Sequence, residues 1–143
     1  MTLKDELFKV GTSIHEAILR ASKGKVLGKG YGMPMLILET TGAKSGQPRS
    51  TVLSTPVVRD GMVVLVASFG GDDRNPAWFH NIKKTPEVTV TMEGETQQMV
   101  ARIPDGPERD ELWAELTAAH DNYAGYQRKT DRKIPVVVLE PAS

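Results

Sequence analysis

The 143-residue chain contains no cysteine. This absence excludes a disulfide framework, a cysteine nucleophile and a metal site built on thiolates. No apolar run approaches the roughly 20 residues that a membrane-spanning helix needs. The first ten residues, MTLKDELFKV, carry an acidic pair where a signal peptide needs an uninterrupted apolar stretch. We therefore expect one cytoplasmic domain of ordinary globular composition.

The chain also lacks an excess of either charge, with 18 basic and 18 acidic residues. Because a long nucleic acid usually needs a larger cationic excess, we expect no nucleic-acid partner. The charge is nevertheless uneven: residues 20–49 hold six basic side chains and one acid, whereas residues 105–121 are mainly acidic. A basic segment within a neutral chain indicates a small anionic ligand or a membrane surface.

Several common sites are missing from the sequence. The three histidines, His15, His80 and His120, fall on different predicted elements without ligand spacing, so we expect no metal site. The GAKSG stretch lacks the glycines of a phosphate loop, because Ala43 and Leu38 occupy their places. No serine stands in a nucleophile elbow, which leaves hydrolysis by a triad without support.

Apolar periodicity and turn residues predict an α+β, mainly β fold. Because tight turns join most of the strands, antiparallel pairing is favoured over a parallel βαβ arrangement. We predict a six-stranded, mostly antiparallel barrel with flanking helices over residues 35–143, preceded by an N-terminal amphipathic helix and basic arm over residues 1–34. The expected elements are a helix at 5–20, strands at 35–41, 49–59 and 62–68, a short helix ending before Pro86, a hairpin around Gly94, a helix from Pro107, a tyrosine-bearing link at 121–133 and a last strand, IPVVVLE.

Proline and asparagine positions refine these predictions. Pro56 indicates that its strand lies at an edge or contains a bulge. Asn75 is the predicted N-cap of the short helix and Pro76 its first residue.

Two stretches suggest an anion site. In ETTGAKSGQPRST, backbone amides of a glycine-containing turn, together with Lys44, Ser45, Arg49 and Ser50, have the chemistry to bind a phosphate or carboxylate. On composition alone, a hairpin whose cations only decorate the surface is the better interpretation. The second stretch, FGGDDRNPAWFHN, favours the ligand-binding interpretation. Its glycines permit close approach of the backbone to a ligand, and the N-terminus of the helix that follows favours anions.

Taken together, TTGAKSGQPR, VASFGGDDRNPAWFHNI and YAGYQRKTDRKIPVVVLEP resemble the motifs of the deazaflavin-dependent nitroreductase family, which uses coenzyme F420. The resemblance extends from about Leu36 to Pro141, in the right order and spacing. It implies the split β-barrel fold related to flavin-binding pyridoxamine-phosphate oxidases, which agrees with the barrel predicted from turns and strand order.

The resemblance also implies a set of site residues. The turn and the following strand would line the site for the phosphate-bearing tail, the third strand would contact the deazaflavin, and the short helix would pack along it. Tyr123 and Tyr126 would stand at the open face, where the acceptor stacks. The implied cofactor-binding residues are Lys44, Ser45, Arg49, Ser50, Thr51, Val52, Val66, Ala67, Ser68, Phe69, Ala77, Trp78, Phe79, His80, Asn81 and Tyr123, and the implied catalytic residues are Ser68, Tyr123 and Tyr126.

Three positions depart from the family pattern. Members often carry a basic residue where this chain has Ala43, and some carry lysine where it has Phe69. Thr55 occupies a place where some relatives present a tyrosine to the substrate. The resemblance therefore implies a site with fewer cations along the coenzyme's anionic tail.

The leading hypothesis is an oxidoreductase that takes a hydride from reduced F420 and gives it to a quinone, an activated alkene (enone) or a nitroaromatic compound. Two alternatives stay open: a split-barrel oxidoreductase that uses FMN, and a non-catalytic carrier of F420. For both tyrosines, a plain packing role competes with a catalytic one.

The sequence leaves a monomer and a homodimer open. The first helix and basic arm allow weak peripheral contact with the inner face of a membrane, although core packing is the stronger interpretation of that helix.

Overall fold

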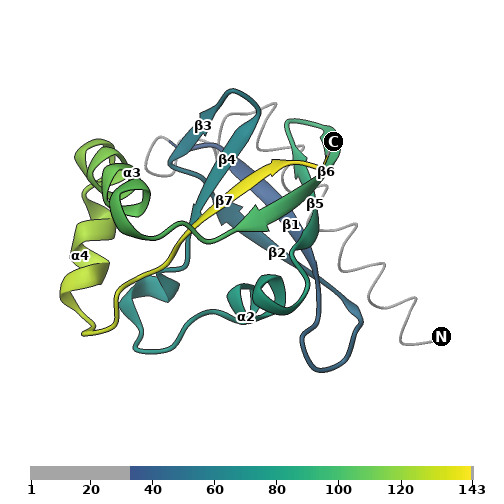
Figure 1. The fold of residues 1–143 in the computed structure, drawn as a ribbon, viewed down its shortest axis with the longest axis horizontal. Helices are drawn as coiled ribbons and strands as arrows, with labels where there is room; N and C mark the ends of the chain where they lie inside the picture. Colours follow the sequence, from purple (N-terminus) through teal and green to yellow (C-terminus); the bar gives the residue numbers. More distant parts are fainter. Residues whose placement is uncertain (1–32, 143) are drawn as a thin grey trace.

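The computed structural model describes residues 33–142, which form one curled antiparallel sheet with helices packed on it (Figure 1). The strand order is β2-β1-β5-β6-β7-β4-β3, and every neighbouring pair is antiparallel. The predicted mainly β fold is confirmed. The elements are β1 (Met35–Thr41), β2 (Pro48–Ser54), β3 (Val57–Arg59), β4 (Met62–Val66), the 3₁₀ helix η2 (Phe69–Gly71), α2 (Ala77–Lys84), β5 (Glu87–Met92), β6 (Glu95–Arg102), α3 (Gly106–Ala119), α4 (Asn122–Arg128) and β7 (Val136–Pro141).

The predicted helix at 5–20, most of the basic arm and His15 lie outside the described residues. Within residues 33–142, no helix is both long enough and apolar enough to span a membrane. At the start of this part, Met33 is buried in the core, and Pro34 O accepts a hydrogen bond from Thr55 N at 3.0 Å.

β4 and β7 lie beside each other and are buried on both faces of the sheet. Leu65 of β4 packs in a cluster with Trp78 of α2 on one face, and its neighbour Val66 packs in a cluster with Leu112 of α3 on the other. β7 alternates between the same two clusters. This double burial explains why both strands are continuous apolar runs rather than alternating ones.

The sheet curls because its two ends are covalently close. β2 and β3 are the outermost strands of the order, yet only Thr55 and Pro56 separate them in sequence. Three Cα–Cα steps of 3.80 Å span at most about 11 Å, so the two edges must approach each other. The predicted strand at 49–59 is therefore two strands, and the sheet has seven rather than six, because Pro56 interrupts the ladder where the chain passes from one edge to the other.

Two other predictions were wrong. The link predicted at 121–133 contains helix α4, which packs on η2 and α3. A helix this short is stabilised by such packing rather than by the helix propensity of its residues. The N-cap of α2 is Pro76, not Asn75. The Asn75 side chain instead accepts a hydrogen bond from Arg132 Nη1 at 2.8 Å. This bond engages Oδ1, the atom with which Asn75 would have capped the helix.

The acidic helix α3 carries one buried cation. Arg109 is 7% exposed, its guanidinium lies 4.5 Å from the centre of the Trp113 ring, and Nη2 donates to Ile134 O at 2.7 Å. Burial lowers the pKa of Arg109. The contact ties α3 to the segment that enters β7.

We expect Leu139→Ala to lower the free energy of unfolding by about 2–5 kcal/mol, because the β7 side chain is fully buried and truncation leaves a cavity. Val58→Ala on β3, where the side chain is 45% exposed, should cost less than about 1 kcal/mol. Urea denaturation of both variants measures the difference. Equal losses would contradict the assignment of β7 to the centre of the core.

Candidate active site

A cavity of about 850 Å³ lies where four separate segments meet: the β1–β2 turn with β2, the end of β4 with η2, the start of α2, and α4. This volume is typical of a pocket for a small organic ligand. The predicted site residues that line it are Lys44, Ser45, Arg49, Ser50, Thr51, Val66, Ser68, Phe69, Ala77, Trp78, His80, Asn81, Tyr123 and Tyr126.

Three predicted residues do not line the cavity. Ala67 and Phe79 are buried in the core cluster, because neighbouring residues of a strand or helix face different ways. Val52 pairs with Ile37 in the sheet and is also not among the lining residues. The sequence did not predict the other lining residues, although most of them lie directly beside predicted ones along the chain: Thr40, Gly42, Ala43, Leu53, Ser54, Leu65, Gly70, Pro76 and Asn122.

The β1–β2 turn is held by its own hydrogen bonds. Gly42 N donates to Gln47 O at 2.8 Å, and Gly46 N donates to Gly42 O at 2.9 Å. A Cβ atom on Gly42 would lie 2.6 Å from Ser45 Oγ and 3.2 Å from Gln47 O, so a larger residue there would displace the Ser45 side chain. The hairpin interpretation is confirmed as the scaffold of this part of the cavity.

Asn81 of α2 fastens the turn to the helix. Its Oδ1 accepts from Ala43 N at 2.9 Å, and its Nδ2 donates to Thr40 Oγ1 at 3.0 Å. Lys84 Nζ adds a bond to Ala43 O at 2.7 Å. These bonds occupy both ends of the buried Asn81 amide, and the contact of Asn81 with a cofactor stays a prediction. Its clearest role is to position the turn.

The turn presents two cations to the cavity. Lys44 and Arg49 are exposed, and neither joins the ion pairs found among residues 33–142. Arg49 donates to Ser45 Oγ and Pro48 O, each at 3.2 Å, which directs its guanidinium along the turn. Positive charge without a protein counterion favours an anionic ligand. The same part of the chain holds no cluster of side chains suited to a metal ion.

The two tyrosines of α4 differ in burial. Tyr123 is 5% exposed, and its hydroxyl donates to Met33 Sδ at 3.3 Å. The prediction that both tyrosines stand at the open face is therefore wrong for Tyr123, which belongs to the wall. Tyr126 is half-buried and meets the Tyr123 ring edge-to-face, with centroids 6.1 Å apart. Thr55, by contrast, is fully buried between β2 and β3 and does not line the cavity.

The FGG segment has an unusual backbone. Phe69 has a φ of +46° and is 51% exposed, and Gly70 and Gly71 also have positive φ. A Cβ atom on Gly71 would lie 2.9 Å from Tyr126 O. Glycine was predicted here for close approach to a ligand; at Gly71 the close approach is to the backbone of α4. Phe69 and Gly70 line the cavity.

The sequence model of the F420H(2)-dependent quinone reductase family matches residues 12–141. The chain belongs to this family. It is 40% identical over 131 residues to an F420H(2)-dependent quinone reductase of Mycobacterium tuberculosis (strain ATCC 25618 / H37Rv), covering 88% of this chain and 87% of the relative. The predicted relationship to F420-dependent reductases is confirmed.

Two solved structures are similar to this quinone reductase family member at 41% sequence identity. One is the F420-H2 dependent reductase FDR-A, with a TM-score of 0.67, covering 75% of this chain and 94% of the other. The second is described as a domain-swapped dimer, with a TM-score of 0.68, covering 75% of this chain and 80% of the other.

Burial raises the pKa of Tyr123 above the ordinary value of 10.0. Because the folded pKa is the higher one, the protonated phenol contributes stability that is fully present below about pH 10 and is lost as pH rises through the folded pKa. We expect Tyr123→Phe to remove the phenol that titrates at higher pH from the alkaline ultraviolet difference spectrum. Tyr126→Phe is the matched control and should leave that transition in place. Loss of a phenol with an ordinary midpoint in Tyr123→Phe would contradict the expectation.

Proposed function

We propose that this chain is an oxidoreductase that transfers a hydride from reduced F420 to a quinone within the four-sided cavity. The observation that carries this proposal is that one cavity combines apolar and aromatic walls with two cations on the β1–β2 turn that form no ion pair among residues 33–142. Family membership supports the same donor and acceptor classes. Enones and nitroaromatic compounds are further acceptors to test.

The residues that line the cavity match the coenzyme in charge and polarity. Its phosphate-bearing, carboxylate-rich tail would lie against Lys44 and Arg49, because charge-assisted hydrogen bonds to anions are the strongest available to a protein. Its flat ring would lie between apolar side chains, among which Leu65 and Val66 end β4 and Trp78 begins α2. A cavity of about 850 Å³ is large enough to enclose most of a ligand of this kind.

When bound, reduced F420 supplies the hydride, and the protein supplies position and electrostatics. Ser68, directly before η2, is half-buried in the cavity wall and has a hydroxyl that can donate to a polar edge of a bound ring. Tyr126 can orient an acceptor through its hydroxyl or its ring. Reduction of a quinone to a quinol consumes one hydride and one proton, and the open mouth gives solvent access for that proton. Tyr123 is protonated at neutral pH, since the ordinary pKa of a tyrosine is 10.0 and burial raises the pKa of Tyr123 further.

Binding of F420 should depend on the turn cations. We expect Lys44→Ala and Arg49→Ala each to raise the Kd for F420 by roughly 10- to 100-fold, the equivalent of one lost hydrogen bond to a charged group. Quenching of deazaflavin fluorescence measures the Kd. Lys133→Ala, an exposed cation 3.9 Å from Asp110 and not part of the cavity, is the control and should bind as the parent does. Unchanged affinity for F420 in both turn variants would contradict the proposal that the turn binds the anionic tail.

FMN also carries a phosphate that the same cations could hold. We expect equilibrium dialysis of the purified protein against each cofactor separately to show retention of F420 and little retention of FMN. Tight retention of FMN without binding of F420 would establish the flavin alternative instead.

A carrier of F420 would bind the coenzyme without using it. We expect a quinone such as menadione to accelerate oxidation of the protein-bound reduced coenzyme over the rate without protein. Absorbance of oxidised F420 follows the reaction. If no quinone, enone or nitro compound accelerates the oxidation, the protein is a carrier.

A homodimer and peripheral membrane contact through residues 1–34 remain predictions. The similar structure described as a domain-swapped dimer supports self-association. Light scattering at several protein concentrations tests it, and a monomer mass throughout would contradict it. Co-sedimentation of full-length and N-terminally truncated protein with anionic liposomes tests membrane contact.

A further inference from the structure

One wall of the cavity is a loop that local hydrogen bonds and contacts from a distant segment hold together. The segment Ser68–Asn75 carries Ser68, Phe69 and Gly70 into the cavity wall and then leads to α2. Phe69 lies in the left-handed region of φ, which is unfavourable for an aromatic residue. Such a conformation persists only where surrounding contacts determine it.

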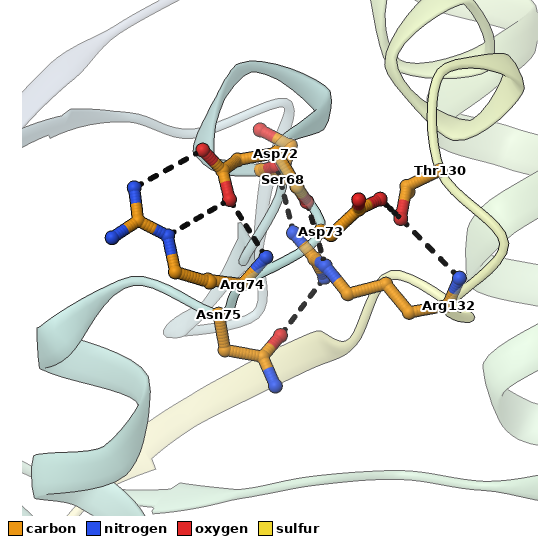
Figure 2. Close-up of polar contacts among 7 residues, drawn as sticks. All are labelled: Ser68, Asp72, Asp73, Arg74, Asn75, Thr130 and Arg132. Atoms are coloured by element: carbon orange, nitrogen blue, oxygen red, sulfur yellow. Dashed lines mark hydrogen bonds and ion pairs between the residues drawn. The ribbon is translucent and has the colours of Figure 1, made fainter.

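Arg132 supplies those contacts from the segment after α4 (Figure 2). Its Nη2 donates to Ser68 O at 2.9 Å, its Nε to Asp72 O at 2.9 Å, and its Nη1 to the Asn75 side chain at 2.8 Å. The three acceptors lie at the beginning, middle and end of the loop. One planar guanidinium therefore binds three separate parts of the loop, and a lysine ammonium lacks the forked geometry to do so.

A second set of contacts joins the same two segments. Thr130 Oγ1 donates to Asp73 Oδ1 at 2.7 Å, and Arg132 N donates to Thr130 Oγ1 at 3.3 Å (Figure 2). Gly71 packs against the backbone at Tyr126. The loop is thus attached to the segment that carries the two tyrosines of the cavity.

The acidic side chains next to Arg132 are not its ion-pair partners among the described residues. Asp72 pairs with Arg74 at 3.1 Å, which lowers the pKa of Asp72. Arg132 binds two main-chain carbonyls and an amide oxygen instead. A cation engaged by main-chain oxygens fixes backbone position rather than neutralising a charge.

We propose that Arg132 is a positioning residue for the cavity: it holds the Ser68–Asn75 loop in its strained form, so that Ser68 and Phe69 are in place before a ligand binds. This inference rests on the proposed function for its ligand, but its effect on the loop is independent of any ligand. The role differs from that of the turn cations, because Arg132 is not among the residues that line the cavity.

The test compares Arg132→Met and Arg132→Lys with Arg102→Met. Arg102 is a matched control, because it also bridges separate elements, through Glu108 and Glu140, but does not line the cavity. Amide hydrogen exchange of the ligand-free proteins reports on the loop, where Gly71 N donates to Ser68 O at 2.9 Å and Asp72 N to Phe69 O at 3.1 Å. F420 titration reports on the cavity.

We expect Arg132→Met to speed exchange within residues 68–75 while the sheet keeps its protection, and to raise the Kd for F420 severalfold. With menadione as acceptor, kcat/KM should fall by about 10- to 100-fold, the scale of loss from a small misplacement of a reacting group. Arg132→Lys should recover only part of each property. Arg102→Met should change neither loop exchange nor the Kd.

Unchanged loop exchange in Arg132→Met, or an equal change in Arg102→Met, would overturn the inference. If Arg132→Met does not fold, Arg132→Lys and Asn75→Ala decide by the same exchange measurement, since each removes part of the contact. Failure of the parent protein to bind F420 would overturn the proposed function alone, and loop exchange would still decide whether Arg132 positions the wall.

Discussion

The short connection through Thr55 and Pro56 constrains the whole structure. It obliges the first and last strands of a seven-stranded order to end close together, and an antiparallel sheet can satisfy that only by curling. Thr55 secures the junction: its backbone N–H binds Pro34 O, and its hydroxyl lies 2.6 Å from Val64 O. Curling brings the β1–β2 turn, the end of β4 and α4 around one space, although these segments are far apart in sequence.

The sequence predicted what depends on local pattern. β1, the hairpin of β5 and β6, and the start of α3 all lie close to their expected positions, because alternation, turn residues and Pro107 are local signals. The sequence did not predict α4, which is short, contains Gly125 and forms through tertiary packing. The cap at Asn75 failed for a related reason, since Arg132 binds that side chain.

The same division applies to the site. Motif resemblance selected the correct segments, and most of the named residues on them line the cavity. It could not say which way each side chain faces: Ala67 faces the core while its neighbours Val66 and Ser68 line the cavity. Nor could it distinguish side chains that meet a ligand from those that hold the wall. Asn81, which also lines the cavity, holds the β1–β2 turn, and Arg132 binds the Ser68–Asn75 loop; only hydrogen bonds between distant segments identify these contacts.

Four segments that lie far apart in the sequence form the cavity, so the cavity exists only in the complete fold. None of the segments presents the cavity alone, so an unfolded or partly folded chain has no comparable binding surface. A ligand held there adds RT ln(1 + [L]/Kd) to the stability of the native state, and about 2.7 kcal/mol when its free concentration is 100 times the Kd. We therefore expect the lifetime of this protein against proteolysis in the cell to follow the supply of its coenzyme, so that cells making little coenzyme would also keep little of the enzyme.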